Sequence, residues 1–127
     1  MKLRVEGGLL FVSAELVISG VAHRLDQVLI DTGSVGTLFG ADRLLELGVV
    51  AEPQDRLLRI RGVGGSEFDF VKRIERVAVG GLSLPNFEIE VGAMDYGFPV
   101  EGILGLDFLL ATRAVIDLAA MEIKPGS

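Results

Sequence analysis

One acidic residue of this sequence lies where it could do chemistry. Asp31 directly follows the apolar run 28–30 and precedes Thr32 and Gly33. A carboxylate at the mouth of a buried strand can accept or donate a proton as a general acid or base. Asp is also common at strand ends because it caps turns, and Gly33 could supply a positive φ there. The tripeptide alone leaves both interpretations open.

The composition excludes several other kinds of site. The 127 residues include no Cys and a single His, so thiol nucleophiles, thiolate metal sites and His-rich metal cages are excluded. Lys and Arg number 12 against 18 Asp and Glu, and the net charge of −6 is unlike that of a nucleic-acid-binding surface. We therefore expect no cofactor, no metal and no nucleic-acid partner.

The apolar segments are too short for a membrane helix. The longest mostly apolar stretch, at 9–22, is interrupted by Glu15 and is followed by His23 and Arg24. A spanning helix needs an uninterrupted apolar run of about 18 residues or more. We predict a chain without membrane contact, in the cytoplasm.

Short strands and tight turns account for most of the pattern. Alternating or continuous apolar runs between turn residues indicate strands, and Ser19-Gly20 and Gly80-Gly81 are typical of two-residue hairpin turns. Strands are expected at 9–18, 21–30, 57–61, 67–74, 76–79, 82–84, 87–91, 102–105, 114–118 and 121–123, and short helices at 41–47 and 106–111. The pattern predicts one domain, residues 1–127, that is a β-barrel or sandwich.

Three acidic positions outside the Asp31 motif have simpler interpretations. Glu88 and Glu90 alternate with apolar residues and are expected on the solvent face of a strand. Asp107 is expected to cap the short helix that begins beside it. None of the three is predicted to take part in chemistry.

Three motifs in order resemble those of the retropepsin-like aspartic proteases, the single-lobe relatives of pepsin. Ile30-Asp31-Thr32-Gly33 is followed about thirty residues later by a glycine-rich hairpin tip, and Ile103-Leu104-Gly105 comes about forty residues after that. The resemblance covers about residues 9–123. It implies an all-β fold, a closed barrel of six to nine strands with one or two short helices, and the activity of an aspartic endopeptidase. Ser34 and the pair Leu106-Asp107 are more similar to cellular and bacterial members than to retroviral ones.

The resemblance implies a role for each motif residue. Asp31 is the expected catalytic carboxylate, Thr32 reaches a partner loop, and Gly33 holds the carboxylate through its N–H. Ser34 is expected to donate a hydrogen bond to the outer carboxylate oxygen. The hairpin tip folds over substrate as a flap, and Val63, Ile103, Leu104 and Phe98 are candidate pocket walls. The full set of expected substrate-binding residues is Ser34, Gly62, Val63, Gly64, Gly65, Ser66, Ile103, Leu104 and Gly105.

The lone Asp-Thr-Gly motif has a consequence for assembly. Peptide hydrolysis by this chemistry uses two carboxylates about 3 Å apart that share one proton. No other Asp of the chain is followed by Thr-Gly or Ser-Gly. Chemistry and resemblance therefore both predict a homodimer in which Asp31 of a second copy completes the pair. The expected substrate is an extended peptide or unfolded protein bound through main-chain hydrogen bonds.

Two other functions stay open from the sequence, because fold does not determine function. The first is a catalytically inactive retropepsin-like module that dimerises or binds peptides. The second is a plain β-barrel domain whose Asp-Thr-Gly only forms a turn.

Overall fold

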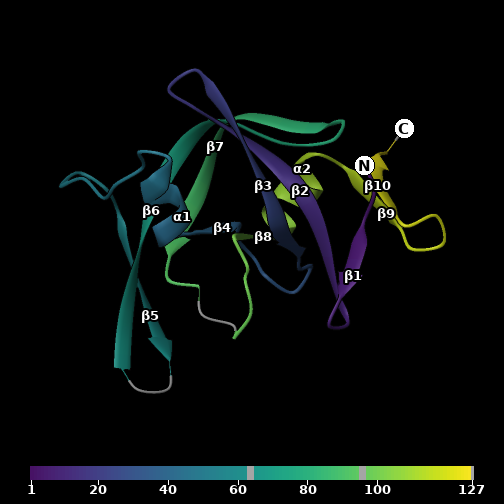
Figure 1. Cartoon of the computed structure of the whole chain (residues 1–127). Coiled ribbons are helices and arrows are strands. Elements are labelled where there is room, and N and C mark those ends of the chain that lie inside the picture. Colours follow the sequence, from purple (N-terminus) through teal and green to yellow (C-terminus); the bar gives the residue numbers. More distant parts are fainter. Residues whose placement is uncertain (63–64, 95–96, 127) are drawn as a thin grey trace.

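Six strands close into a ring in this computed structural model, which describes residues 1–62, 65–94 and 97–126 and only the backbone of 59–62 and 65–67. Around the ring each strand is hydrogen-bonded to the next, and the last, β6, pairs with the first, β2 (Figure 1). The order is β2 (Leu9–Ile18), β3 (Val21–Ile30), β8 (Gly102–Leu104), β4 (Leu38–Gly40), β7 (Leu82–Gly92) and β6 (Gly65–Val79).

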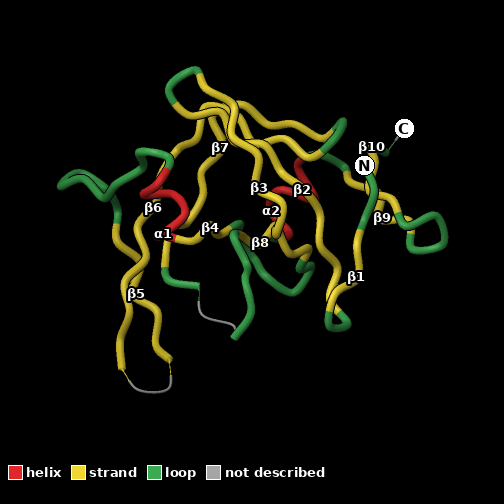
Figure 2. Tube along the Cα trace, viewed as in Figure 1, coloured by secondary structure: helices red, strands yellow, loops and turns green. Residues whose placement is uncertain are grey.

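The other elements lie outside this ring (Figure 2). They are β1 (Arg4–Glu6) on β2, β5 (Leu57–Gly62) on β6, the pair β9 (Ala114–Asp117) and β10 (Glu122–Pro125), and the helices α1 (Ala41–Glu46) and α2 (Leu106–Ala111). The prediction of an all-β fold with one or two short helices is confirmed, and the ring has six strands. The described residues contain ten strands in all. The short strands β1 and β4 were not predicted, because three residues carry too little pattern.

Alternating apolar residues of the ring strands form the core. The fully buried side chains include Leu16, Val28 and Val77 from three different strands, together with Phe39 of β4 and Phe108 of α2. Burying one such side chain contributes about 1.5–3 kcal/mol to folding. The core therefore holds α2 against the ring, and α2 and the ring strand β4 flank the Asp31 loop.

Strands β6 and β7 are longer than predicted. The sequence pattern indicated breaks near 75 and 85, but the ladder runs without a register shift from Phe70–Val91 to Val79–Leu82. Pairing along the whole ladder overrides the weak local signal of Pro85 and of Asn86, whose φ is 47°. The Ser19-Gly20 turn has the positive φ values, 50° and 77°, that a tight hairpin needs.

Both ends of the chain pair with one another. Leu3 N–H donates to the Met121 carbonyl at 2.9 Å, and Ile123 N–H donates to the Met1 carbonyl at 2.9 Å. Figure 1 shows the two termini side by side next to β10. The sequence at 1–8 and 124–127 did not indicate strands, yet β1 and β10 include part of these segments.

Neither helix in the described part of the chain has the length and apolar character needed to cross a membrane.

Candidate active site

Asp31 lies at the end of β3, where that strand runs parallel to β8. The pairing matches Ile30 with Leu104, and the N–H of Asp31 donates to the Leu104 carbonyl at 3.0 Å. The half-buried Asp31 begins a tight loop in which the Ser34 N–H donates to the Asp31 carbonyl at 3.2 Å. The backbone of Asp31 is therefore held from both sides.

The carboxylate of Asp31 is oriented by the residue two positions later. Gly33 N–H donates to Asp31 Oδ1 at 2.9 Å. A Cβ at Gly33 would lie 3.2 Å from the same oxygen, so glycine leaves room for this contact. Thr32 and Gly33 are exposed, and Val35 is 86% exposed. The loop thus presents one oriented carboxylate beside an uncovered surface.

The hydroxyl of Ser34 does not serve Asp31 as expected. It donates to the Gly36 carbonyl at 2.8 Å. A serine hydroxyl has one hydrogen to donate, so this bond uses it within the loop. The predicted Ser34 bond to the outer carboxylate oxygen is replaced by one that shapes the turn.

A buried network under the loop was missed by sequence reasoning. Thr37, 1% exposed, donates through Oγ1 to Asp107 Oδ1 at 2.7 Å and accepts from the N–H of Gly105 at 3.0 Å. Thr37 N–H also donates to Asp107 Oδ2 at 3.3 Å. Asp107 does accept one helix N–H, that of Phe108, but its other bonds tie α2 to the loop. The N-cap of α2 is Gly105 and no side chain caps it, so the predicted cap role of Asp107, which lies within the helix, is wrong.

Gly105 lies where the loop crosses the start of α2. A Cβ on Gly105 would lie 2.2 Å from the Gly36 carbonyl oxygen and 3.0 Å from that of Ser34. Leu106 N–H donates to the Ser34 carbonyl at 2.7 Å, which draws the two backbones together. The structure thus places Gly105 against the loop backbone, where only glycine fits.

Glu90 also lies behind the loop and not on the open solvent face that the alternation predicted. Its N–H donates to the Thr37 carbonyl at 2.9 Å, and its Oε2 would be 2.5 Å from a Cβ on Gly36. Burial, then the negative charges of Asp69 and Asp107, raise the pKa of Glu90, while Arg56 opposes the rise. Strand periodicity could not reveal this, because the covering loop is distant in sequence.

The predicted flap corresponds to the β5–β6 hairpin, which projects away from the ring in Figure 1. Its backbone pairs run from Leu57–Phe70 to Gly62–Gly65, and Ser66 is opposite Arg61. Val63 and Gly64 lie outside the described residues. The described part of this hairpin is thus paired along its whole length, as far as Gly62 and Gly65.

The candidate pocket walls separate into two groups. Ile103 and Leu104 point to opposite faces of β8, and the fully buried Leu104 belongs to the core. Phe98 is 44% exposed and packs edge-on against Phe11, with ring centroids 6.4 Å apart. Ile103 is also buried, at 6% exposed, so Phe98 is the exposed wall candidate of the three.

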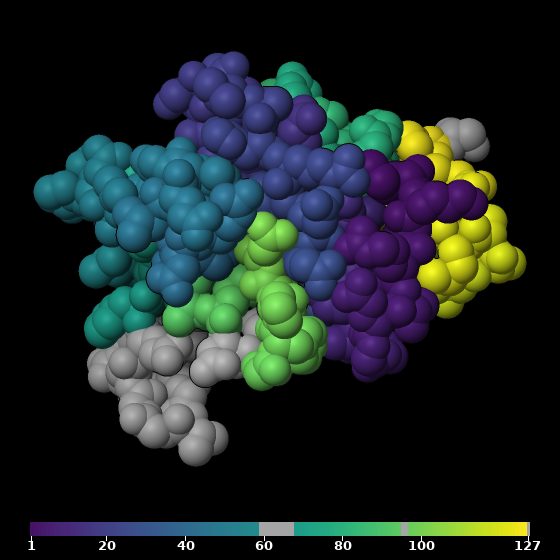
Figure 3. Space-filling model, viewed as in Figure 1, coloured from purple at the N-terminus to yellow at the C-terminus, as the bar shows by residue number. Residues whose placement is uncertain are grey.

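A hollow of about 570 Å³ lies between α1 and residues 93–94 and 98–101. Figure 3 shows the segment around residue 100 on the surface, between the α1 region and the N-terminal region. Its lining includes Gly40, Ala41, Arg43, Met94, Phe98 and Glu101.

Among the described residues, no group of three Asp, Glu or His side chains could hold a metal ion.

The comparisons with known proteins agree with this geometry. A family model described as aspartyl protease matches residues 14–108. The fold is similar to the crystal structure of a retropepsin-like aspartic protease from Rickettsia conorii, with a TM-score of 0.65 and 18% identity over 97% of this chain and 95% of that chain. No curated protein matches the sequence. The chain therefore belongs to the aspartyl protease family and has the retropepsin-like fold.

Proposed function

We propose that the chain is a homodimeric aspartic endopeptidase that cleaves extended peptides with a pair of Asp31 carboxylates. The observation that carries the proposal is the oriented Asp31 carboxylate, held by the Gly33 N–H at 2.9 Å on a loop whose tip is exposed. An acidic group that only caps a turn does not need the buried support that Thr37 and Asp107 give this loop.

The reaction needs one proton shared between two carboxylates. The ionised carboxylate takes a proton from water as the water oxygen attacks the peptide carbonyl carbon, and the protonated carboxyl gives its proton to the carbonyl oxygen. The tetrahedral intermediate then collapses: the C–N bond breaks, the leaving nitrogen takes the proton that the first carboxylate received from water, and a hydroxyl of the intermediate returns its proton to the second carboxylate. Two negative charges this close cannot both persist, which keeps the pair singly protonated.

The second carboxylate comes, in this proposal, from Asp31 of another copy. The surface next to Asp31 supports such a contact, because Val35 is 86% exposed, Leu106 is 37% exposed and Leu110 is 68% exposed. Val35 and Leu106 are neighbours through the bonds Leu106 N–H to Ser34 carbonyl and Asp107 N–H to Val35 carbonyl. Leu110 follows Leu106 by one helical turn. A partner on this face would cover the apolar side chains and bring Thr32 and Gly33 of both copies together.

The substrate in this proposal is an extended peptide segment between the catalytic loops and the flap. The β5–β6 hairpin offers backbone groups for main-chain hydrogen bonds, with Gly62, Gly65 and Ser66 at its described end. Closing such a hairpin over the peptide excludes bulk water from the carboxylates. Phe98 supplies exposed apolar surface for peptide side chains, and unfolded or unstructured protein is the expected substrate class.

The test compares the wild-type chain with Asp31→Asn on a heat-denatured protein between pH 4 and 7. The variant is expected to keep its fold and self-association and to cleave at least about a thousandfold more slowly. Asp42→Asn, an equal change at an exposed position on α1, should leave cleavage unchanged. Equal cleavage by the Asp31→Asn protein would contradict the proposal. Peptide binding without cleavage by the wild-type chain would favour the inactive binding module.

A further inference from the structure

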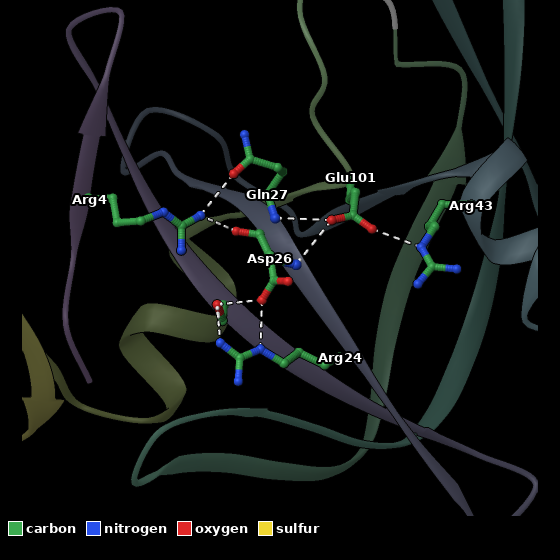
Figure 4. Close-up of polar contacts among 7 residues, drawn as sticks. Arg4, Arg24, Asp26, Gln27, Arg43 and Glu101 are labelled. Carbon is green, nitrogen blue, oxygen red and sulfur yellow. Dashed lines mark hydrogen bonds and ion pairs between the residues drawn. The ribbon is translucent and has the colours of Figure 1, made fainter.

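Glu101, directly before β8, is bonded to two elements outside the catalytic loop, β3 and α1. Its N–H donates to the Gln27 carbonyl of β3 at 2.8 Å, and its carbonyl accepts from Gly40 N–H, at the start of α1, at 2.9 Å. Its carboxylate lies between the same two regions, as Figure 4 shows. The side chain is 24% exposed, so most of it is enclosed by these partners.

The carboxylate of Glu101 accepts three hydrogen bonds. Its Oε1 accepts from the N–H groups of Asp26 and Gln27, both at 3.0 Å. Its Oε2 accepts from Arg43 Nε at 2.8 Å. Both oxygens are thus occupied, one by the backbone of β3 and one by α1 (Figure 4). The bond from Glu101 is the foremost reason that the pKa of Arg43 lies above its usual value, which agrees with a persistent pair.

The two backbone donors belong to a β-bulge. Between the pairs Val12–Val28 and Ala14–Leu25, strand β2 has one residue, Ser13, where β3 has the two residues Asp26 and Gln27. A bulge leaves ladder N–H groups without their regular strand partners. Glu101 supplies an acceptor for both of them.

Other side chains hold the same bulge from its outer face (Figure 4). Ser13 Oγ donates to Asp26 Oδ1 at 2.9 Å, and Arg24 Nε donates to it at 2.6 Å. Arg4 donates to the Asp26 carbonyl and to Gln27 Oε1. These contacts hold side chains and the carbonyl group of the bulge, whereas Glu101 is the acceptor for its N–H groups.

The bulge lies a short distance before Asp31 on the same strand. From Val28 to Ile30, β3 pairs with Gly102 to Leu104 of β8, and the N–H of Asp31 ends this ladder on Leu104. Glu101 therefore bonds β3 at one end of the short ladder, and Leu104 bonds it at the other. A slip of one residue in such a ladder would turn every side chain to the opposite face.

We infer that Glu101 is a positioning residue, which locks the β3 bulge and thereby sets the register that carries Asp31 to its place. The effect on turnover rests on the proposed function, whereas the effect on the β3 backbone does not. Loss of the carboxylate leaves two backbone donors and Arg43 without their acceptor. The register of β3 then rests on the three-residue ladder with β8 and on the β2 pairs that flank the bulge, Val12–Val28 and Ala14–Leu25.

Amide hydrogen exchange of the whole chain without substrate tests the structural half. Glu101→Ala is expected to speed exchange several-fold at Asp26, at Gln27 and, through the ladder, at Asp31. Glu101→Gln keeps an acceptor oxygen and should restore most of the protection. Arg43→Met removes only the α1 partner and should leave these three amides as in the wild type. Unchanged exchange at Asp31 in Glu101→Ala would overturn the inference.

Turnover per active site tests the catalytic half. Sites are counted by titration with a peptide that mimics the tetrahedral intermediate, so a lower fraction of folded protein reduces the count and not kcat. Glu101→Ala is expected to lower kcat per site about tenfold or more with little change in KM, because a misplacement near 1 Å can cost up to about a hundredfold. Glu101→Gln should recover most of kcat. An unchanged kcat per site would overturn the inference. Faster exchange at Asp31 in a protein whose wild type cleaves nothing would support the positioning role and contradict only the proposed function.

Discussion

The two structures that would enclose a substrate are held in different ways. The Asp31 loop rests on hydrogen bonds of 2.7 and 3.0 Å among Thr37, Asp107 and Gly105, with Thr37 fully enclosed. The root of the β5–β6 hairpin is instead tied by ion pairs. Buried hydrogen bonds to a charged group stabilise strongly and are little screened, whereas exposed ion pairs contribute little and weaken with salt. We therefore expect the catalytic floor, meaning the network of Thr37, Gly105 and Asp107 under the Asp31 loop, to be rigid and the β5–β6 hairpin to be adaptable.

The ion pairs at the hairpin root centre on Lys72 and Glu88. Lys72 Nζ lies 2.5 Å from Glu52 and 2.8 Å from Asp55, which attaches the segment before β5 to β6. Arg56 and Arg73 both approach Glu88, at 2.6 and 3.5 Å. The Lys72 side chain is only 14% exposed, but Glu52 is half exposed. Water and salt therefore reach the contacts of Glu52 and Glu88 more easily than they reach Thr37, whereas the Lys72–Asp55 pair is more shielded, with Asp55 only 9% exposed.

The largest expected effect is on the catalytic floor. Gly105→Ala puts a methyl group 2.2 Å from the Gly36 carbonyl oxygen, a backbone atom that cannot move without opening the loop. We expect the free energy of unfolding to fall by about 3 kcal/mol or more. Gly48→Ala, at φ +88° with no atom near the added methyl, should cost only about 1–2 kcal/mol. Urea denaturation measures both, and equal losses would refute the crowding argument.

A smaller effect is expected from the buried hydroxyl. Thr37→Val keeps the shape but removes the donor to Asp107 and the acceptor for Gly105 N–H. The unfolding free energy should fall by about 1–3 kcal/mol, since buried polar groups lose their partner. The cleavage rate should fall with it. Thr112→Val, which removes a half-buried hydroxyl bonded to the Phe108 carbonyl, is the matched control and should cost about 0.5–1.5 kcal/mol. A Thr37→Val protein as stable as the Thr112→Val protein would contradict the claim that the network of Thr37, Asp107 and Gly105 stabilises the loop more than an ordinary side-chain hydrogen bond does.

The smallest effect is expected at the hairpin root. Lys72→Met should lower the melting temperature slightly, and the difference from the wild type should shrink in high salt. The bond from Lys72 lowers the pKa of Asp55 and of Glu52; burial opposes the charged form of Lys72, but the two carboxylates nevertheless raise its pKa.

The pH dependence of the difference in melting temperature between the wild type and Lys72→Met follows from the direction of each pKa shift. The lowered carboxyl pKa values make the stabilisation complete above the ordinary values near about 4 and remove it as pH falls through the lowered values. The raised Lys72 pKa keeps the stabilisation complete below about 10.4 and removes it at higher pH. Thermal melts of both proteins at pH 3, 7 and 11 measure this. A difference that is as large at pH 3 as at pH 7 would be at odds with the ion-pair account.

Local chemistry could be predicted from the sequence, and contacts between distant segments could not. Asp31, Gly33 and the Ser19-Gly20 turn carry their meaning within a few residues, since a strand end, an N–H two positions on and a positive φ are local properties. Thr37 and Asp107 are separated by 70 positions. No periodicity in either segment indicates that they meet.

The sequence also could not show which face of a short strand each side chain occupies. In a strand of three residues, Ile103 and Leu104 are equally apolar, and the pattern cannot tell which one faces the core. Glu101 precedes this strand and showed no signal, because its partners on β3 are 74 and 75 positions away. The fold class could be predicted from the repeated pattern of strands and turns alone. The contacts that support the site could not, because they form only when the closed ring brings distant segments together.

Mixed dimers test the shared carboxylate pair most directly. Wild-type chain is mixed with Asp31→Asn chain at constant total concentration, under conditions in which subunits exchange, and the cleavage rate is measured against the wild-type fraction. If each active site needs Asp31 from both copies, the rate falls as the square of that fraction, to about a quarter at an equal mixture. A rate that falls in simple proportion, to about half, would contradict the account.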